Sequence, residues 1–503
     1  MILINPPIVK PGEPPAGIAK LSGALCAANI RHFLLDANIE GIYYLLKHAP
    51  EPFDTWTLRA SRRLSYNVNA LKNISTYNNI DRYKRAVIDL NRILEYSASG
   101  SGIHLTLADY HHRELSPVKS RDLIYAAEHP EENPFYPYFS KRLSEIIEDE
   151  NISVAGFSIN YLSQTLSAFA MIGFLRSRFP RLVIIGGGGL LTSWMRNPTW
   201  KNHFGGLLDH CVSGPGEIPL LTILGHDPME EKNFRPSYDM LPLKCYLSPG
   251  LVLPFGTSIG CYWSKCSFCP ERAERSKFVQ INADLVIDYL HLLVNRHNPV
   301  LIHFTDNAIS PVMMRKIIKQ PPGPPWYGFA RVDEHLTDPS FCRELKKSGC
   351  IMLKLGLESG DQQVLDYMNK GCNVDASSAS LKALKRAGIA TYVYLLFGTP
   401  LETVREARKT LNFVAEHRDY IDYINLAVFN LPINSPESGN VDIVDFYEGD
   451  LSLYTDFKHS EGWGRRQVRE FLDKEFKRHP AIQPILRRQP QFFTSNHAPF
   501  FKM

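Results

Sequence analysis

The feature that most constrains the fold is a regular alternation of short apolar segments with helical patterns, which occurs twice along the 503 residues. In the first series we expect strands at Met1–Asn5, His32–Asp36, Val154–Asn160, Leu182–Ile185 and Asp209–Ser213. The helices between and after them are expected at Ala16–Ile30, Ser163–Arg178 and Ile218–Leu224. Alternation of this kind predicts an α/β fold with a doubly wound parallel sheet.

The second series contains six further strand–helix steps. Strands are expected at Pro254–Gly260, Leu301–Asp306, Trp326–Arg331, Met352–Glu358, Thr391–Phe397 and Ile421–Phe429. Helices are expected between them, for example at Ala283–Asn295, Pro339–Lys347, Ala379–Ala387 and Thr403–His417. Six steps are fewer than the eight of a closed β/α barrel, so we expect an open, partial (β/α)6 barrel.

The two series divide the chain into four expected parts. These are a doubly wound domain at 1–225 with a mostly helical insertion at about 41–138, a Pro-rich linker at 226–253, the partial barrel at 254–435 and a short C-terminal region at 436–503. The insertion is basic, with 11 Lys/Arg against 6 Asp/Glu between Arg59 and Asp122, and so is the stretch Lys458–Arg488 with 9 against 4. Either a solvated helical surface or a basic partner surface accounts for the insertion.

Composition excludes several classes of protein. Lys+Arg 56 against Asp+Glu 52 is too balanced to indicate a nucleic-acid or membrane partner. The sequence has no apolar run of about 18 residues, and its start, MILINPPIVK, lacks the basic n-region of a signal peptide. Three of the nine cysteines fall within nine residues and the others are scattered, which favours a reducing, cytoplasmic setting over a disulfide framework.

The clustered cysteines, Cys261, Cys266 and Cys269, have the spacing C-x4-C-x2-C in IGCYWSKCSFCPE, directly after the first strand of the second series. Three thiolates at this spacing can hold three irons of a 4Fe–4S cluster and leave the fourth iron open to a substrate or cofactor. Structural zinc is the main alternative, but it needs four ligands, and the nearest further thiol is Cys245. A fourth cluster ligand from Cys350 or Cys372 is also open.

Several motifs in a fixed order accompany this loop. They are INPP, PPAGIAKLSGAL, LLDANIEG, GFSIN, VIIGGGG, SGPGE, HFTDN, FARVDE, LKLGLESG and YLLFGTPLET. Through them the chain resembles the radical S-adenosylmethionine (SAM) superfamily over about 1–40 and 152–435. It is most similar to members with an N-terminal cobalamin-binding domain. One departure is the first cysteine gap, which is one residue longer than the common C-x3-C.

The resemblance implies that Cys261, Cys266 and Cys269 bind a 4Fe–4S cluster whose open iron chelates SAM. Reduction of the cluster then yields a 5′-deoxyadenosyl radical. Phe268 matches the aromatic position near the adenine, and the resemblance assigns Glu358, Arg331 and Gly398 to SAM as well. Each of these three also has a local explanation, as a turn residue, a salt-bridge partner and a tight turn respectively.

The resemblance further implies cobalamin in the first domain, at the carboxyl ends of its strands. The candidate residues are Ser158, Asn160, Gly186, Gly187, Gly188, Gly214, Gly216 and Glu217. Their glycines lack the spacing of dinucleotide and P-loop fingerprints. In the Asp-x-His-x-x-Gly signature of cobalt-ligating modules, this chain has Asn38 where the His would stand, so no His ligand to cobalt is expected.

Three functions are therefore considered. The first is a cobalamin-dependent radical SAM methyltransferase acting on an unactivated carbon. The second is a cobalamin-independent radical SAM enzyme catalysing rearrangement, cyclisation or methylthiolation, and the third is a zinc-stabilised, non-enzymatic binding protein. The expected partners of an enzyme are an electron donor such as flavodoxin or ferredoxin, and a substrate that the basic segments suggest is anionic or large. No membrane or nucleic-acid partner is expected.

Overall fold

The structure is a computed structural model that describes residues 1–226, 233–444, 448–491 and 494–503. It divides into two compact units: Met1–Gly250 with Tyr447–Leu453, and Leu251–Phe446 with Tyr454–Met503. Residues 227–232 of the expected linker lie outside the described residues. Among the helices that are described, none is long and apolar enough to cross a membrane.

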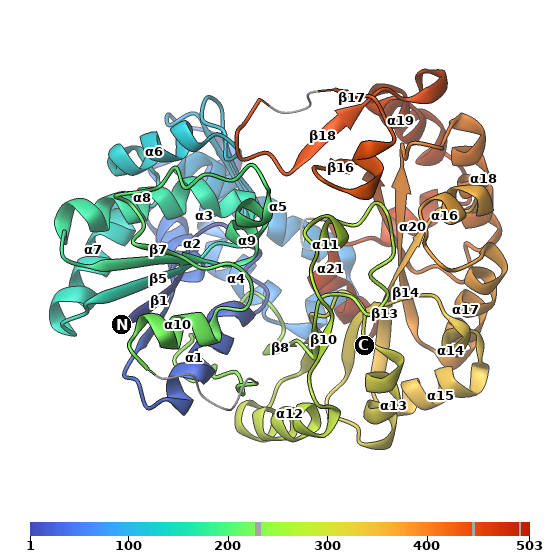
Figure 1. The fold of residues 1–503 in the computed structure, drawn as a ribbon, viewed down its shortest axis with the longest axis horizontal. Coiled ribbons are helices and arrows are strands. Elements are labelled where there is room, and N and C mark those ends of the chain that lie inside the picture. The colour runs from blue at the N-terminus through green and yellow to red at the C-terminus, as the bar shows by residue number, and fades with distance from the viewer. Residues whose placement is uncertain (227–232, 445–447, 492–493) are drawn as a thin grey trace. The chain divides into compact units, whose positions relative to one another are not determined.

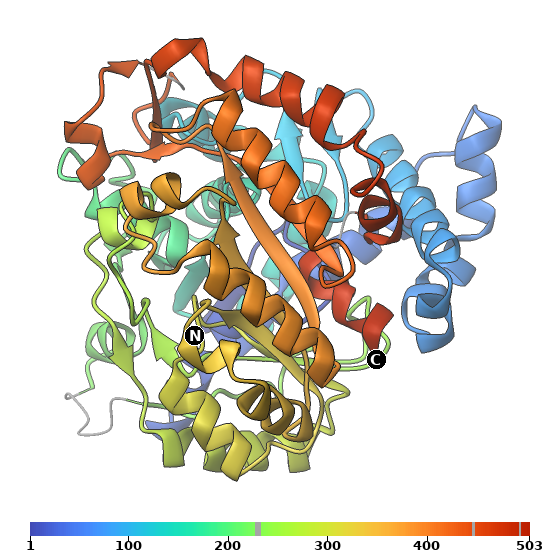
Figure 2. The same ribbon diagram turned by 90° about the vertical axis from the view of Figure 1, so that its right-hand side faces the viewer.

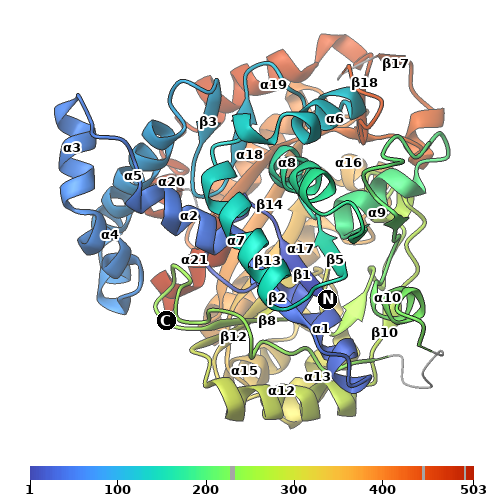
Figure 3. The ribbon, with the colours of Figure 1, turned by 90° about the vertical axis from the view of Figure 1, so that its left-hand side faces the viewer.

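The first unit is built on a five-stranded parallel sheet of order β2-β1-β5-β6-β7 (Figure 3). Its strands are β1 (Ile2–Asn5), β2 (Phe33–Asp36), β5 (Val154–Ser158), β6 (Val183–Gly187) and β7 (His210–Cys211). The strand order reverses between β1 and β5, which makes the carboxyl ends of these two strands the topological switch point.

Helices pack on this sheet in two groups. The helices α1 (Ala16–Ala27) and α10 (Glu217–Ile223) contact each other, and α2 (Ala37–Lys47), α7 (Tyr136–Asp149) and α8 (Leu162–Arg178) contact one another in turn. The central α8 is apolar nearly all round, with eleven of its seventeen residues buried, as expected of a helix covered on both sides. This confirms the doubly wound sheet predicted for the first series.

The insertion after β2 is mostly helical, as expected. It contains α3 (Thr55–Arg62), α4 (Leu64–Leu71), α5 (Ile80–Ser97) and α6 (Ser120–Glu128), with short 3-10 turns at Ile74–Asn78 and Pro130–Glu132. It also contains an antiparallel hairpin of β3 (Ile103–Leu105) and β4 (Tyr110–His112). In Figure 3, α3 and α4, from the first part of this insertion, lie beside α5.

The second unit contains a six-stranded parallel sheet whose order, β15-β14-β13-β12-β11-β8, follows the sequence without a reversal (Figure 1). The strands are β8 (Val252–Phe255), β11 (Leu301–Phe304), β12 (Trp326–Ala330), β13 (Cys350–Glu358), β14 (Ala390–Phe397) and β15 (Tyr423–Val428). Among the described residues, β8 and β15 each pair with one strand only, so the sheet is open, and this confirms the predicted partial barrel.

Helices connect the strands of this sheet on its outer face, as Figure 2 shows. They are α12 (Ala283–His297), α13 (Pro311–Lys319), α14 (Glu334–Thr337), α15 (Pro339–Lys347), α16 (Gln362–Tyr367), α17 (Val374–Ala387) and α18 (Val404–Glu416). The strand expected at Pro254–Gly260 is wrong in extent. It is split into β8 and a short β9 (Ser258–Ile259), which pairs antiparallel with β10 (Val279–Gln280).

The C-terminal region adds small elements to the second unit. A three-stranded antiparallel sheet is formed by β16 (Leu431–Pro432), β17 (Ile443–Val444) and β18 (Tyr454–Phe457), with 3-10 turns at Pro436–Gly439 and Ser460–Gly462. The helices are α19 (Arg465–Phe471), a π-helical turn at Leu472–Phe476, α20 (Gln483–Arg488), α21 (Thr494–His497) and a 3-10 turn at Ala498–Lys502. The short α11 (Pro270–Ala273) follows the last cysteine of the motif.

Candidate functional site

The three clustered cysteines lie on the connection between β9 and β10, called here the cysteine loop (residues 260–270). A buried carboxylate positions the start of this loop. Asp306, which follows β11, accepts hydrogen bonds from the Thr257 backbone N–H at 3.0 Å and from the Ser258 hydroxyl at 2.6 Å. Burial raises the pKa of Asp306, whereas these bonds oppose the rise. Asp306 therefore serves to hold the chain where it leaves β8.

The second half of the cysteine loop is fixed by backbone and side-chain bonds. The Ser267 N–H donates to the Met368 carbonyl at 3.0 Å, and the Ser267 hydroxyl donates to Glu437 Oε1 at 3.0 Å. Phe268 packs against two buried apolar clusters, one that contains Met368 and one that contains Leu431. The loop is thus anchored on the segment that follows α16.

Two cations lie beside Cys266. Arg331, at the end of β12, places Nη1 3.7 Å from the Cys266 Sγ, and its Nη2 donates to the Lys370 carbonyl. The Lys370 ammonium donates to Glu358 Oε1 at 2.7 Å; the Lys370 side chain is buried and that of Glu358 is mostly buried. Burial alone would lower the pKa of Lys370, but the charges of Glu358 and Cys266 raise it overall. Metals bind cysteine as the thiolate, and the two cations here would offset that negative charge.

An aromatic side chain of the longer cysteine gap packs on the same group. The Arg331 guanidinium lies 4.4 Å from the centre of the Trp263 ring, and the Trp263 Nε1 donates to the Asn369 carbonyl at 3.0 Å. The ring rests on Gly371, where a Cβ atom would lie 1.9 Å from it. Sequence reasoning did not single out Trp263, Lys370 or Gly371, and the only signal was that Trp263 falls inside the motif.

The structure places the three cysteines on one loop. Within the part of the chain that is described, no three His, Cys, Asp or Glu side chains are disposed to hold a metal ion. Cys266 is buried and Cys261 and Cys269 are partly buried. Burial raises the pKa of Cys269 to about 11, although hydrogen bonds from the backbone amides of Glu271 and Arg272 act to lower it. The chemistry of the donor set, three soft thiols beside two cations, fits an iron–sulfur cluster.

The residues expected at SAM do not all meet. Phe268, Arg331 and Glu358 surround Lys370, whose ammonium is 5.6 Å from the Phe268 ring centre. Glu358 has a positive φ of 66°, and Gly356 beside it leaves the space that the Glu358–Lys370 pair fills. Gly398 follows β14 and has its own partner there, because its N–H donates to Glu402.

The residues expected at cobalamin lie at the carboxyl edge of the first sheet, where their polar groups bond to one another. Asn160 Nδ2 donates to the Ser158 hydroxyl at 3.1 Å, and Asn160 Oδ1 accepts from the Gly189 N–H at 2.8 Å. Glu217 is buried in an ion pair with Lys20 at 2.6 Å.

The glycines of this edge approach their own chain. A Cβ at Gly188, whose φ is 105°, would lie 2.4 Å from the Ile159 carbonyl oxygen. One at Gly186 would lie 2.9 Å from the Leu208 side chain and one at Gly216 would lie 3.1 Å from Leu21, whereas Gly187 has only ordinary contacts. The Gly214 N–H donates to the Thr192 hydroxyl at 2.9 Å.

Asn38, which stands in place of the signature His, is committed to the backbone. Its Oδ1 accepts from the Val9 N–H and its Nδ2 donates to the Val9 carbonyl, both at 2.9 Å. The side chain is 1% exposed. This edge therefore offers no cobalt ligand from Asn38, and a cobalamin there would be held by shape and by contacts with the half-exposed loops.

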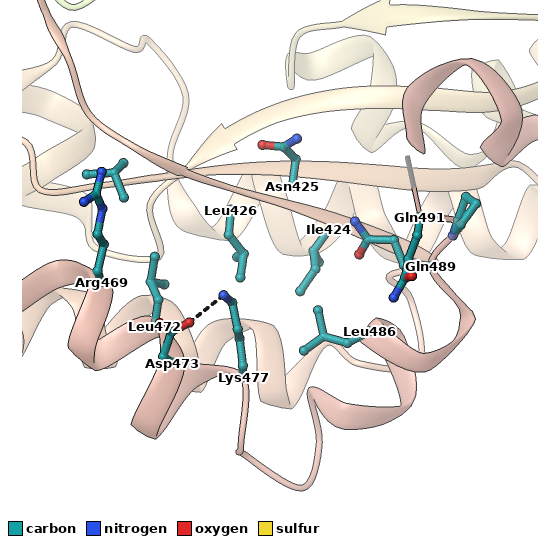
Figure 4. Close-up of a pocket in the computed structure, with 12 residues that line it drawn as sticks. Ile424, Asn425, Leu426, Arg469, Leu472, Asp473, Lys477, Leu486, Gln489 and Gln491 are labelled. Atoms are coloured by element: carbon teal, nitrogen blue, oxygen red, sulfur yellow. Dashed lines mark hydrogen bonds and ion pairs between the residues drawn. The ribbon is translucent and has the colours of Figure 1, made fainter. Parts of the chain in front are cut away.

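A cavity of about 700 Å³ lies along the edge of β15 (Figure 4), and no residue of the cysteine loop is among those that line it. Leu472 and Leu486 face Ile424 and Leu426 across it, and Lys477 donates to Asp473 at its rim at 2.7 Å. It is lined by Ile424, Asn425, Leu426, Val428, Arg469, Leu472, Asp473, Lys477, Leu486, Gln489, Pro490 and Gln491. None of the cluster, SAM or cobalamin residues predicted from the sequence lines this cavity.

Comparison with known proteins agrees with the fold and the loop. Residues 257–414 match the sequence model of the Radical SAM superfamily. Over 203 residues the chain is 29% identical to an uncharacterized methyltransferase of Pyrococcus horikoshii, covering 38% of this chain and 43% of that protein. It is 24% identical to the anaerobic magnesium-protoporphyrin IX monomethyl ester cyclase of Rubrivivax gelatinosus over 251 residues, 46% of this chain and 44% of the relative. The chain thus spans less than half the length of these curated relatives.

Two solved structures share the fold. One is OxsB, a cobalamin-dependent SAM radical enzyme with aqua-cobalamin and SAM bound, at a TM-score of 0.60 and 13% identity, over 94% of this chain and 66% of OxsB. The other is the radical SAM methyltransferase TsrM from Kitasatospora setae, with cobalamin and a [4Fe-4S] cluster bound, at a TM-score of 0.53 and 14% identity, over 88% and 77% of the two chains. The cysteine loop lies within residues 257–414, the segment of this chain that matches the Radical SAM superfamily.

Proposed function

We propose that this protein is a cobalamin-dependent radical SAM methyltransferase that acts on an unactivated carbon. The observation that carries the proposal is the three-cysteine loop within the segment that matches the superfamily, joined to a doubly wound unit. The likeness of the whole chain to OxsB and TsrM in fold, and the methyltransferase relative, support the cobalamin and the methyl transfer.

Cys261, Cys266 and Cys269 would hold the 4Fe–4S cluster, and Phe268, Glu358, Arg331 and Gly398 would contact SAM. When bound, the cluster would supply one electron to SAM, which would release the 5′-deoxyadenosyl radical. Cobalamin would carry the methyl group. The carboxylate of Glu358 suits an ammonium or hydroxyl donor, which Lys370 supplies in this structure. Residues around the cysteine loop would keep water from the radical by their burial.

The carboxyl edge of the first unit would hold the cobalamin, through Ser158, Asn160 and the loops that carry Gly186–Gly188 and Gly214–Glu217. Because the Asn38 amide is bonded to Val9, we propose that no side chain at this position ligates cobalt. An electron donor such as flavodoxin or ferredoxin would reduce the cluster, and we propose an anionic or large substrate in a cytoplasmic setting.

The experiment is anaerobic purification with quantification of iron, sulfide and corrin, followed by reduction in the presence of SAM. The proposal expects 5′-deoxyadenosine from the wild-type protein and none from Cys266→Ala. Corrin in a one-to-one amount, with S-adenosylhomocysteine as a second product, would support methyl transfer. Cys350→Ala is the matched control, because Cys350 is a buried thiol at the first residue of β13, at the opposite end of that strand from Glu358.

Two results would redirect the proposal. A corrin-free protein that still makes 5′-deoxyadenosine would favour the cobalamin-independent alternative. A relative named as a cyclase supports cyclisation as a possible reaction type. One zinc per chain, with no sulfide and no visible colour, would favour the zinc-stabilised binding protein and contradict radical chemistry.

A further inference from the structure

The extra length of the cysteine loop brings an indole ring onto the cations beside Cys266. The gap between Cys261 and Cys266 holds Tyr262, Trp263, Ser264 and Lys265. Trp263 is partly buried and bonds through Nε1 to the Asn369 carbonyl, so its ring is fixed in direction as well as in position. The ring therefore joins the loop to the segment 369–371.

Gly371 makes this position available. It has a φ of 69°, and an added Cβ would lie 1.9 Å and 2.4 Å from two carbons of the Trp263 ring. Any side chain here would collide with the ring, and most would also be strained at this φ. The Trp263 ring thus occupies the space that a side chain at position 371 would need.

The ring in turn restrains Arg331. The guanidinium lies 4.4 Å from the ring centre, a distance at which a cation over an indole is attracted to its face. The guanidinium also contacts the Lys370 carbonyl and the Cys266 Sγ. Arg331 is 8% exposed, so its charge acts on the sulfur with little screening by water.

The second cation completes a small charged group. The Lys370 ammonium is paired with Glu358 and lies under the Phe268 ring, which comes from the other cysteine gap. One aromatic residue from each gap therefore covers one cation. With Arg331 and Lys370 against Glu358, the group carries one net positive charge beside Cys266.

We propose that Trp263 is a positioning residue that holds the Arg331 guanidinium against the Cys266 sulfur, so that this buried positive charge sets the reduction potential of the cluster held there. The inference rests on the proposed function, because it needs a cluster on this loop. A positive charge and hydrogen bonds at a cluster sulfur stabilise the reduced, more negative form and raise the potential.

The test is a redox titration of the reconstituted protein followed by electron paramagnetic resonance. Arg331→Gln should move the midpoint potential to a more negative value, and Trp263→Ala should move it in the same direction although it removes no charge. Trp263→Phe keeps an aromatic face over Arg331 and should move the potential less than Trp263→Ala. Gly371→Ala should shift the potential as Trp263→Ala does, because the added methyl group would displace the Trp263 ring without changing Arg331 itself.

Two variants serve as controls. Lys265→Gln removes a cation 4.8 Å from the same ring, but Lys265 is exposed, so water screens its charge and the potential should stay near the wild-type value. Gly388→Ala has a comparable φ of 75°, and its Cβ would meet only the Lys346 side chain at 3.9 Å, so it reproduces the backbone strain without a contact to the loop. Circular dichroism and iron content establish that each variant is folded and loaded.

Three outcomes decide the matter. Negative shifts for Arg331→Gln, Trp263→Ala and Gly371→Ala, with both controls unmoved, support the inference. Wild-type potentials in Trp263→Ala and Gly371→Ala overturn it while leaving the proposed function intact, including the case in which Arg331→Gln only weakens SAM binding. A wild-type protein that forms no 4Fe–4S cluster overturns the proposed function and this inference together.

Discussion

Glu402 gives a stability prediction that follows directly from its surroundings. It lies after β14 and is 1% exposed. Its Oε2 accepts from the Gly398 N–H and from Trp463 Nε1, whereas Oε1 has no hydrogen-bond partner among the described residues. Burial raises the pKa of Glu402 from 4.5 to about 8, and the bonds from Gly398 and Trp463 act against this rise.

The magnitude follows from the difference between the folded and unfolded pKa. Between pH 4.5 and pH 8 the folded state holds a proton that the unfolded chain has lost, so the free energy of unfolding falls as the pH rises through this window. One pKa unit corresponds to about 1.4 kcal/mol, so protonating Glu402 costs about 3 kcal/mol at pH 7. Glutamine can keep both accepted bonds and needs no proton. Glu402→Gln should therefore raise the free energy of unfolding by about 3 kcal/mol at pH 7.

The assay is thermal unfolding of the wild type and Glu402→Gln from pH 5 to pH 9. A gain of about 3 kcal/mol in a unit of this size should raise the melting temperature by roughly 6–12 °C at pH 7. Above pH 8 the wild-type curve should level off, and the variant should lack the decline below pH 8. A variant whose melting temperature declines with pH as steeply as that of the wild type would refute the reasoning.

Glu406→Gln is the matched control, one turn further along the same segment. Glu406 accepts from the Thr403 N–H at 3.0 Å in the capping box of α18. Burial acts to raise the pKa of Glu406, but the hydrogen bonds from Thr403 lower it overall. The contribution of Glu406 to stability is therefore lost as the pH falls, not as it rises. This variant should lose about 1 kcal/mol because its cap is weakened, and it should keep the wild-type decline in stability between pH 5 and pH 8.

Three further predictions concern packing and buried polar groups. Tyr246→Phe removes the 2.7 Å bond to the buried carboxylate of Asp36, which should cost about 1–3 kcal/mol in urea unfolding; an unchanged midpoint would contradict it. Gly173→Ala places a Cβ 1.8 Å from the Ala127 carbonyl oxygen and should cost about 1–3 kcal/mol, whereas Gly205→Ala, with nothing within 4 Å, should be near neutral in the same assay. Lys370→Met leaves Glu358 without its cation and should cost about 3–5 kcal/mol in thermal unfolding, and adding Glu358→Gln should restore part of the loss; an additive double variant would contradict the pairing.

Much of the fold follows from the sequence because strand and helix periods alternate clearly. The order β2-β1-β5-β6-β7 and the sequential order of the six-stranded sheet are those expected of right-handed β–α–β connections. The hairpin of β3 and β4 was not predicted, since each strand has three residues and pairs only with the other. The break between β8 and β9 was also missed, because it depends on Asp306 binding Thr257 from a neighbouring strand.

The site could be predicted only in part, for a related reason. Spacing identifies cysteines on one loop, but the partners of that loop come from distant segments. Lys370 follows Glu358 by twelve residues and meets it only because α16 intervenes and turns the chain back. Gly371 and Trp263 are more than a hundred residues apart, and nothing local in either indicates their contact.

The central claim is that three thiols of one loop hold a cluster whose fourth iron is free for SAM. The most direct measurement is electron paramagnetic resonance of the reduced, reconstituted protein before and after SAM is added. The account predicts a 4Fe–4S signal that SAM shifts, and its loss in each of Cys261→Ala, Cys266→Ala and Cys269→Ala. A signal that SAM leaves unchanged, or one that survives loss of any of the three thiols, would contradict it.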